Sequence, residues 1–100
     1  MSNYDKGANR ERLFVKMLLY GWNGWPPALA AARSAGSHGK LDVWAMWPDV
    51  VRVFQLKSGS GRLDDVEVDF LTDLAGRTSR ISEVFGVCWE DYRAPVLRRF

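Results

Sequence analysis

Two apolar runs separated by a Pro-Asp pair constrain the fold of this chain more than any other feature. The runs read LDVWAMW and VVRVFQLK, and Pro48-Asp49 between them is a favourable turn pair with proline at its first central position. The pattern predicts an antiparallel hairpin in which the numbers of paired residues sum to 97. Asp42 then lies opposite Gln55, and their Cβ atoms are about 5 Å apart on one face of the sheet.

The rest of the chain supplies helices and strands around this hairpin. The patterns predict helices over 6–20 and 63–76, and strands over 84–90 and 95–100. Gly21 and Gly76 are expected to end the two helices. The stretch ALAAAR (28–33) favours a helix by propensity alone. Together these elements predict one α/β (α+β) domain over residues 1–100, with a mixed central sheet flanked by helices.

Composition excludes several classes of protein. Fourteen basic and 12 acidic residues give a formal net charge of +2, which is compatible with a polyanionic partner without requiring one. The single cysteine, Cys88, excludes an internal disulfide framework and a multi-cysteine zinc site. No apolar run approaches the roughly 18 residues of a membrane span, and the N-terminus lacks the apolar region of a signal peptide. We therefore expect a cytoplasmic protein with no membrane partner.

The first helix carries an acid on its apolar side. Glu11 lies within about 40° of Val15 and Leu18 around the helix axis, inside the arc that faces the core. A carboxylate in that position is costly unless it is paired or holds a metal ion. A salt bridge at the edge of the arc, for example to Arg33, is the alternative to a metal.

The second strand of the hairpin carries polar groups on the face that Asp42 occupies. Gln55 and Lys57 both project to that face, and the backbone carbonyl of Leu56 lies between them. A carboxylate, an amide oxygen and a carbonyl are hard ligands that suit Mg²⁺ or Mn²⁺. A lysine beside such a cation can stabilise charge on a phosphate or activate a water molecule. An ordinary buried polar network is the other interpretation of these residues.

Three segments of the chain resemble a known family. KGANRER, RSAGSHGKLDVWA and VFQLKS are similar, in this order, to the segments that define archaeal-type Holliday junction resolvases of the PD-(D/E)xK nuclease superfamily. The resemblance covers about residues 6–58 and implies a restriction-endonuclease-like core. Because the family has a short strand before RSAGS, we expect ALAAAR to be a strand, which makes the order of elements α-β-β-β-α-β-β.

The resemblance also implies roles for the catalytic residues. Glu11 would be the helix-borne acid near the metal, and Asp42 would be the central metal ligand. Gln55 and Lys57 would stand where the family has Glu-x-Lys, and the Leu56 carbonyl would complete the ligands. Glutamine in place of glutamate removes one negative charge and should weaken metal binding.

Further basic and polar residues are expected to contact DNA. Arg12 would contact the DNA backbone or serve structurally, and Arg33 and Ser37 would belong to a phosphate-binding loop whose glycines allow close approach of a phosphate. In the same loop Lys40 can donate to a phosphate. His38 could contact phosphate, help to activate water or be solvated, and we favour phosphate. Arg62 follows Arg52 and Lys57 in a stretch without acids, and is the last expected contact.

These features predict a Mg²⁺-dependent endodeoxyribonuclease, with Mn²⁺ as a substitute, that resolves four-way junctions in DNA recombination and repair. Two symmetric phosphodiester cuts need two active sites, so a homodimer bound to branched DNA is expected. Trp22 and Trp25 are the candidates for an exposed contact or a subunit interface. The alternatives are another nuclease of the superfamily, with a different DNA substrate, and a catalytically silent module that recognises junction shape.

Overall fold

The central hairpin has the register that its turn predicts. In the computed structural model, which describes residues 3–34, 41–58, 62–79 and 82–100, β2 (Val43–Met46) pairs antiparallel with β3 (Val51–Ser58). Val43 lies opposite Phe54, and the next pair along the ladder keeps the same sum of 97. The predicted hairpin and its register are therefore confirmed.

The alanine-rich segment is a strand. β1 (Ala30–Arg33) pairs antiparallel with β2 along its whole length. Pro26 and Pro27 separate it from the preceding helix, because neither residue can occupy a helix interior. Just before the strand, the Leu29 amide donates to the Met46 carbonyl at 2.8 Å. Pairing with β2 outweighs the helix propensity of the alanines at this edge of the sheet.

The first helix forms as predicted. α1 (Asn3–Tyr20) begins slightly before the predicted start and ends immediately before Gly21. Gly21 has a φ of +100°, a conformation that favours glycine and stops the helix. Phe14 and Leu18, from the predicted apolar arc, are completely buried.

The second helix ends one residue later than predicted. α2 (Asp65–Arg77) continues past Gly76, the residue at which we expected it to end. The chain leaves the helix at Thr78, whose backbone amide still donates to the Leu74 carbonyl at 3.1 Å. This last hydrogen bond closes the helix without a residue in the left-handed region, so no glycine is needed there.

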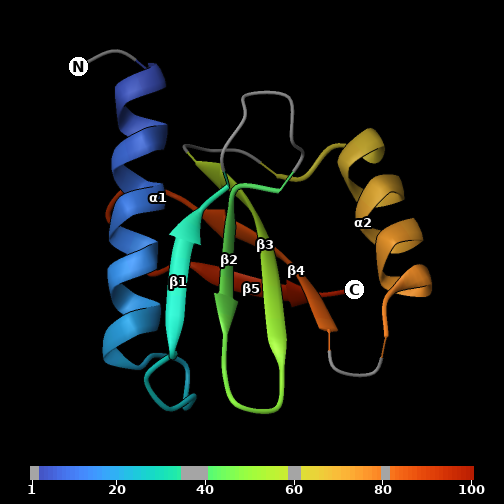
Figure 1. Cartoon of the computed structure of the whole chain (residues 1–100). Helices are drawn as coiled ribbons and strands as arrows, with labels where there is room; N and C mark the ends of the chain where they lie inside the picture. The colour runs from blue at the N-terminus through green and yellow to red at the C-terminus, as the bar shows by residue number, and fades with distance from the viewer. Residues whose placement is uncertain (1–2, 35–40, 59–61, 80–81) are drawn as a thin grey trace.

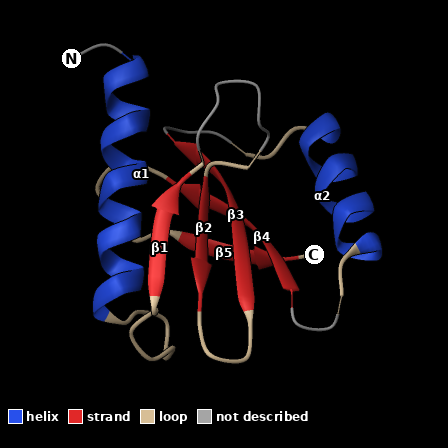
Figure 2. Ribbon diagram, in the orientation of Figure 1, coloured by secondary structure: helices blue, strands red, loops and turns tan. Residues whose placement is uncertain are grey.

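A crossover through α2 makes the sheet mixed. β3 and β4 (Ser82–Trp89) run parallel, and β5 (Val96–Arg99) returns antiparallel to β4. Hydrogen bonds link neighbouring strands in the order β1-β2-β3-β4-β5. Figures 1 and 2 show β1, β2 and β3 side by side, with α1 to the left and α2 to the right. Across the described residues the fold is α+β, with two helices and a five-stranded, mixed, open sheet. The predicted order of elements is confirmed.

The two helices contact opposite faces of the sheet. Phe54 of β3 packs edge-on against Phe14 of α1, with ring centroids 4.9 Å apart. The next residue, Gln55, hydrogen-bonds to Glu67 of α2. Consecutive residues of a strand point to opposite faces, so α1 and α2 lie on different sides of β3. Polar groups gathered around Gln55 therefore lie between the sheet and α2.

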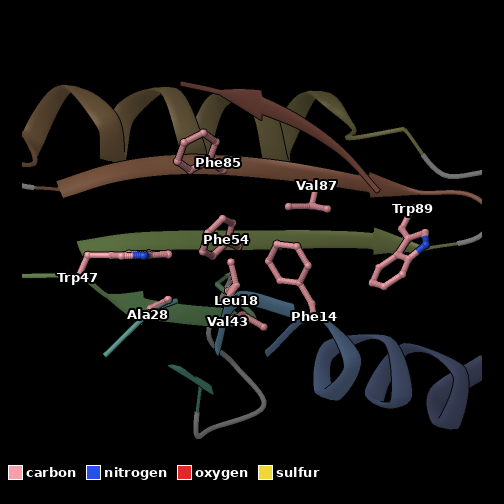
Figure 3. Packing of buried hydrophobic residues seen from close by; sticks show 10 residues of the cluster. Phe14, Leu18, Ala28, Val43, Trp47, Phe54, Phe85, Val87 and Trp89 are labelled. Carbon is pink, nitrogen blue, oxygen red and sulfur yellow. The ribbon is translucent and has the colours of Figure 1, made fainter. Parts of the chain in front are cut away.

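The main core lies between α1 and the sheet. Figure 3 shows aromatic and aliphatic side chains from α1, β2, β3 and β4 gathered there. Trp22 and Trp25 are half-buried and pack against this cluster, and the exposed contact or subunit interface expected of them stays a prediction. The Trp25 ring meets Trp47 and Phe85 at centroid distances of 5.4 and 5.5 Å. The tryptophans around the proline break therefore extend the core.

Candidate active site

Asp42 is fixed where β1, β2 and β3 meet. Its backbone amide donates to the Phe54 carbonyl at 2.8 Å, and its carbonyl accepts from the Ser34 amide at 2.9 Å. Its carboxylate reaches across to β3 and accepts from the Leu56 amide, with 2.7 Å between Oδ2 and the nitrogen. These three bonds hold the side chain at the end of the hairpin opposite the Pro48-Asp49 turn.

The two polar residues of β3 meet the same carboxylate of α2. Gln55 Nε2 donates to Glu67 Oε2 at 3.0 Å, and Lys57 Nζ lies 3.3 Å from Glu67 Oε1. The Glu67 side chain is only 16% exposed, whereas that of Lys57 is 37% exposed. The predicted pair on β3 therefore lies on one face, and an unpredicted acid joins its two members.

Glu67 is placed by the start of α2. Asp64 caps the helix by accepting from the Glu67 amide at 2.8 Å, and the Asp64 amide donates to Glu67 Oε1 at 3.0 Å. This reciprocal capping box fixes both the helix start and the glutamate side chain. The spacing Asp64-x-x-Glu67 is visible in the sequence, but only the packing of α2 beside β3 brings Glu67 to Gln55 and Lys57.

Gln55 presents one polar atom without a partner. Its Oε1 is buried and accepts no hydrogen bond from any described residue. The orientation of the amide follows from chemistry, because a carboxylate at Glu67 accepts from an N–H group and repels an oxygen. A buried acceptor left without a donor costs about 1–3 kcal/mol. A cation, or a donor beyond the described residues, would relieve this cost.

Glu11 is paired with Arg33. The Arg33 Nε atom lies 2.9 Å from Glu11 Oε1, with the glutamate side chain 21% exposed. Arg33 ends β1, so the ion pair joins α1 to the edge of the sheet. The salt bridge that the sequence offered as an alternative to metal binding is present. Glu11 nevertheless lies close enough to Asp42 to act on its ionisation.

The surroundings of Asp42 favour its protonated form. Burial is the largest effect and raises the pKa of the carboxyl from 3.8 to about 6. The Leu56 amide opposes this shift by hydrogen-bonding to the charged form, while the negative charges of Glu11 and Glu67 add to it and Arg33 lowers it. Asp42 therefore lies in a negative neighbourhood, to which a cation would be attracted.

The predicted DNA-contacting residues are only partly described. Arg12 is exposed and donates to Asn9 Oδ1 at 3.2 Å. Together with Val15, Lys16 and Arg33 it lines a groove of about 370 Å³ beside the Glu11–Arg33 pair. Arg62 is exposed on the segment that leads into α2. The remaining predicted contacts lie outside the described residues: Ser37, His38 and Lys40.

The oxygen atoms at this site are the type of ligand that a hard divalent cation binds. The Asp42 carboxylate and the Gln55 Oε1 atom are both oxygen donors, and the latter has no other partner among the described residues. Histidine, cysteine, aspartate and glutamate alone do not form a three-residue metal cluster anywhere in the described parts of the chain. Among the described residues, a cation beside Asp42 would therefore depend on Gln55 or on backbone oxygens for further ligands. The Leu56 carbonyl as a ligand stays a prediction, because the recorded contact of Leu56 with Asp42 is through its amide.

Comparisons with known proteins do not place the chain in a family. Searches of protein-family models, of curated proteins and of solved structures found no match to the chain. Neither helix within the described ranges is long and apolar enough to cross a membrane.

Proposed function

We propose that the chain is a metal-dependent endonuclease that resolves branched DNA by hydrolysing phosphodiesters. The observation that carries this proposal is that the Asp42 carboxylate accepts from the Leu56 amide on β3, between Gln55 and Lys57, whose side chains share one face and meet Glu67. Asp42 is held by the Leu56 amide, and Gln55 keeps a buried oxygen without a partner. A restriction-endonuclease-like core, as the sequence resemblance implies, is part of the same proposal.

The cation would be held by Asp42 and Gln55. When bound, it supplies positive charge next to a phosphate and lowers the pKa of a water molecule. The Leu56 amide orients the Asp42 carboxylate for this task. Mg²⁺ or Mn²⁺ is the ion that these oxygen donors favour.

Lys57 and the basic residues of the groove beside α1 would act on the nucleic acid. The partly exposed Lys57 ammonium can stabilise the negative charge that develops on a phosphate during hydrolysis. Arg12 and Lys16 line the groove beside α1 and can neutralise phosphates away from the cut. Each chain offers one such site, so symmetric cleavage of two strands would need a two-fold homodimer.

A catalytically silent junction-binding module is the second candidate. The ion pair between Lys57 and Glu67 and the hydrogen bond from Gln55 already form a connected polar network, which can exist for structural reasons. Gln55 also lacks the charge that a glutamate would bring to a metal. Binding of branched DNA without cleavage in Mg²⁺ or Mn²⁺ would favour this candidate.

The test compares cleavage and binding of a synthetic four-way junction. We expect Asp42→Asn and Lys57→Ala each to abolish Mg²⁺-dependent cleavage while junction binding in a gel-shift assay is largely retained. Asp49→Asn is the matched control, because it makes the same change at an exposed residue in the distant hairpin turn. Full cleavage by Asp42→Asn would refute the assignment. Cleavage should also be compared on a junction, a flap, a linear duplex and a single strand under the same conditions. Preferred cleavage of one of the last three would indicate another nuclease of the superfamily, with a different DNA substrate.

A further inference from the structure

Glu67 belongs to α2, outside the hairpin that carries the proposed ligands, and yet contacts several groups of the site. Glu67 contacts Gln55 at 3.0 Å, Lys57 at 3.3 Å and the Asp64 amide at 3.0 Å. Its side chain is 16% exposed, so its charge lies in a poorly solvated place. A helix cap alone does not need the contacts with β3, because the capping box is complete with Asp64.

Glu67 brings a negative charge next to Gln55, which is itself neutral. A glutamine at 55 leaves the strand without the negative charge that would balance a divalent cation and the neighbouring lysine. The Glu67 carboxylate lies within hydrogen-bonding distance of that glutamine and within ion-pair distance of Lys57. Its negative charge also acts on Asp42. A carboxylate is therefore present beside position 55, although it is carried by α2.

The same carboxylate determines which atom Gln55 offers to the site. Because Glu67 accepts from Nε2, the amide has to direct Oε1 elsewhere, where it is buried without a partner. Without Glu67, either end of the amide could face the site. Glu67 thus contributes negative charge and also fixes the orientation of a neutral ligand.

We propose that Glu67 is the second acid of the cation site and supplies, from α2, the negative charge that Gln55 does not carry. This inference rests on the proposed function, because it takes Asp42 and Gln55 to hold a divalent cation. Glu67 acts through its charge and through its hydrogen bond to Gln55. Cation affinity should therefore depend on the charge of Glu67 even where the fold does not.

The test measures Mn²⁺ binding to the full chain by electron paramagnetic resonance of the free ion. Glu67→Gln keeps an oxygen that can accept from the Asp64 amide, since glutamine also serves in a capping box. We expect this variant to fold and to bind Mn²⁺ at least about 10-fold more weakly. Asp65→Asn is the matched control, because it removes the same charge from an exposed residue in the first turn of α2.

A charge swap makes the test specific. The double variant Gln55→Glu/Glu67→Gln exchanges the two side chains and preserves both the net charge and the possible hydrogen bond between them. It should recover most of the affinity that Glu67→Gln loses, whereas a merely structural role for Glu67 would give no such recovery. Circular dichroism and thermal unfolding of each variant confirm that the fold is retained.

The outcomes separate this inference from the proposed function. If wild type binds Mn²⁺, Asp42→Asn does not, and Glu67→Gln binds as well as Asp65→Asn, the role of Glu67 is overturned and the cation site stands. If wild type binds no Mn²⁺, or Asp42→Asn binds it equally well, the cation site itself is overturned. Weakened binding by Glu67→Gln with recovery in the swap supports the inference.

Discussion

Replacing Asp42 by asparagine should stabilise the metal-free protein at neutral pH. The folded state raises the pKa of this carboxyl from 3.8 to about 6, so the folded chain binds the proton more tightly than the unfolded chain does. The contribution of the Asp42 carboxyl to the free energy of unfolding should therefore be greatest below pH 3.8. This contribution should be lost as the pH rises to about 6. Asparagine removes the charge and keeps an oxygen that can accept from the Leu56 amide.

The size of the effect follows from the change in pKa. A rise from 3.8 to about 6 corresponds to at most about 3 kcal/mol between low and neutral pH. Asp42 is only partly buried and solvent screens its neighbours, so we expect about 1–2 kcal/mol. For a domain of this size, that gain would raise the melting temperature by about 5–10 °C.

The assay is urea unfolding of wild type and Asp42→Asn in a chelating buffer, at pH 3.5, 5 and 7. The variant should gain stability over wild type as the pH rises, and the two proteins should be nearly equal at pH 3.5. Saturating Mn²⁺ should stabilise wild type alone at pH 7, because a ligand of the folded state adds to its stability. A variant that is no more stable than wild type at pH 7 without metal would refute the account of the Asp42 environment.

Two further changes test the core and the groove. Phe14→Ala should lower the free energy of unfolding by about 3–5 kcal/mol in denaturant titrations, because Phe14 is completely buried and packs against Phe54. A loss below about 1 kcal/mol would contradict this packing. Lys16→Ala should lower by about one the number of counterions released on junction binding, measured as the slope of log affinity against log salt. Arg77→Ala, in the last turn of α2, is the control and should leave that slope unchanged.

The hairpin is the part of the fold that local sequence predicts best. One turn pair between two apolar runs determines its register, and the register in turn places Asp42 beside β3. The strand β1 is different, since its alanines favour a helix and only pairing with β2 makes it extended. The end of α2 at Arg77 rather than at Gly76 likewise depends on a hydrogen bond from the Thr78 amide to the Leu74 carbonyl that composition does not reveal.

The sequence predicts which side chains of one strand share a face, but not which side chains of different elements meet at the candidate site. Alternation within β3 is enough to place Gln55 and Lys57 on one face. The contacts of Glu67 with Gln55 and Lys57 were not predicted, because they depend on how α2 packs beside the sheet, which no local pattern encodes. For Glu11, helical periodicity identified a carboxylate that needs a partner, and the structure supplies Arg33 as that partner. Tertiary packing therefore decides which acids act together.

The most direct test of the central claim is anomalous diffraction from crystals of the protein soaked in Mn²⁺. A cation held by Asp42 and Gln55 predicts an anomalous peak within coordinating distance of the Asp42 carboxylate and of Gln55 Oε1. Crystals of Asp42→Asn treated in the same way should lack this peak. A peak that persists in the variant, or wild-type crystals whose only Mn²⁺ peaks lie away from Asp42, would contradict the cation site.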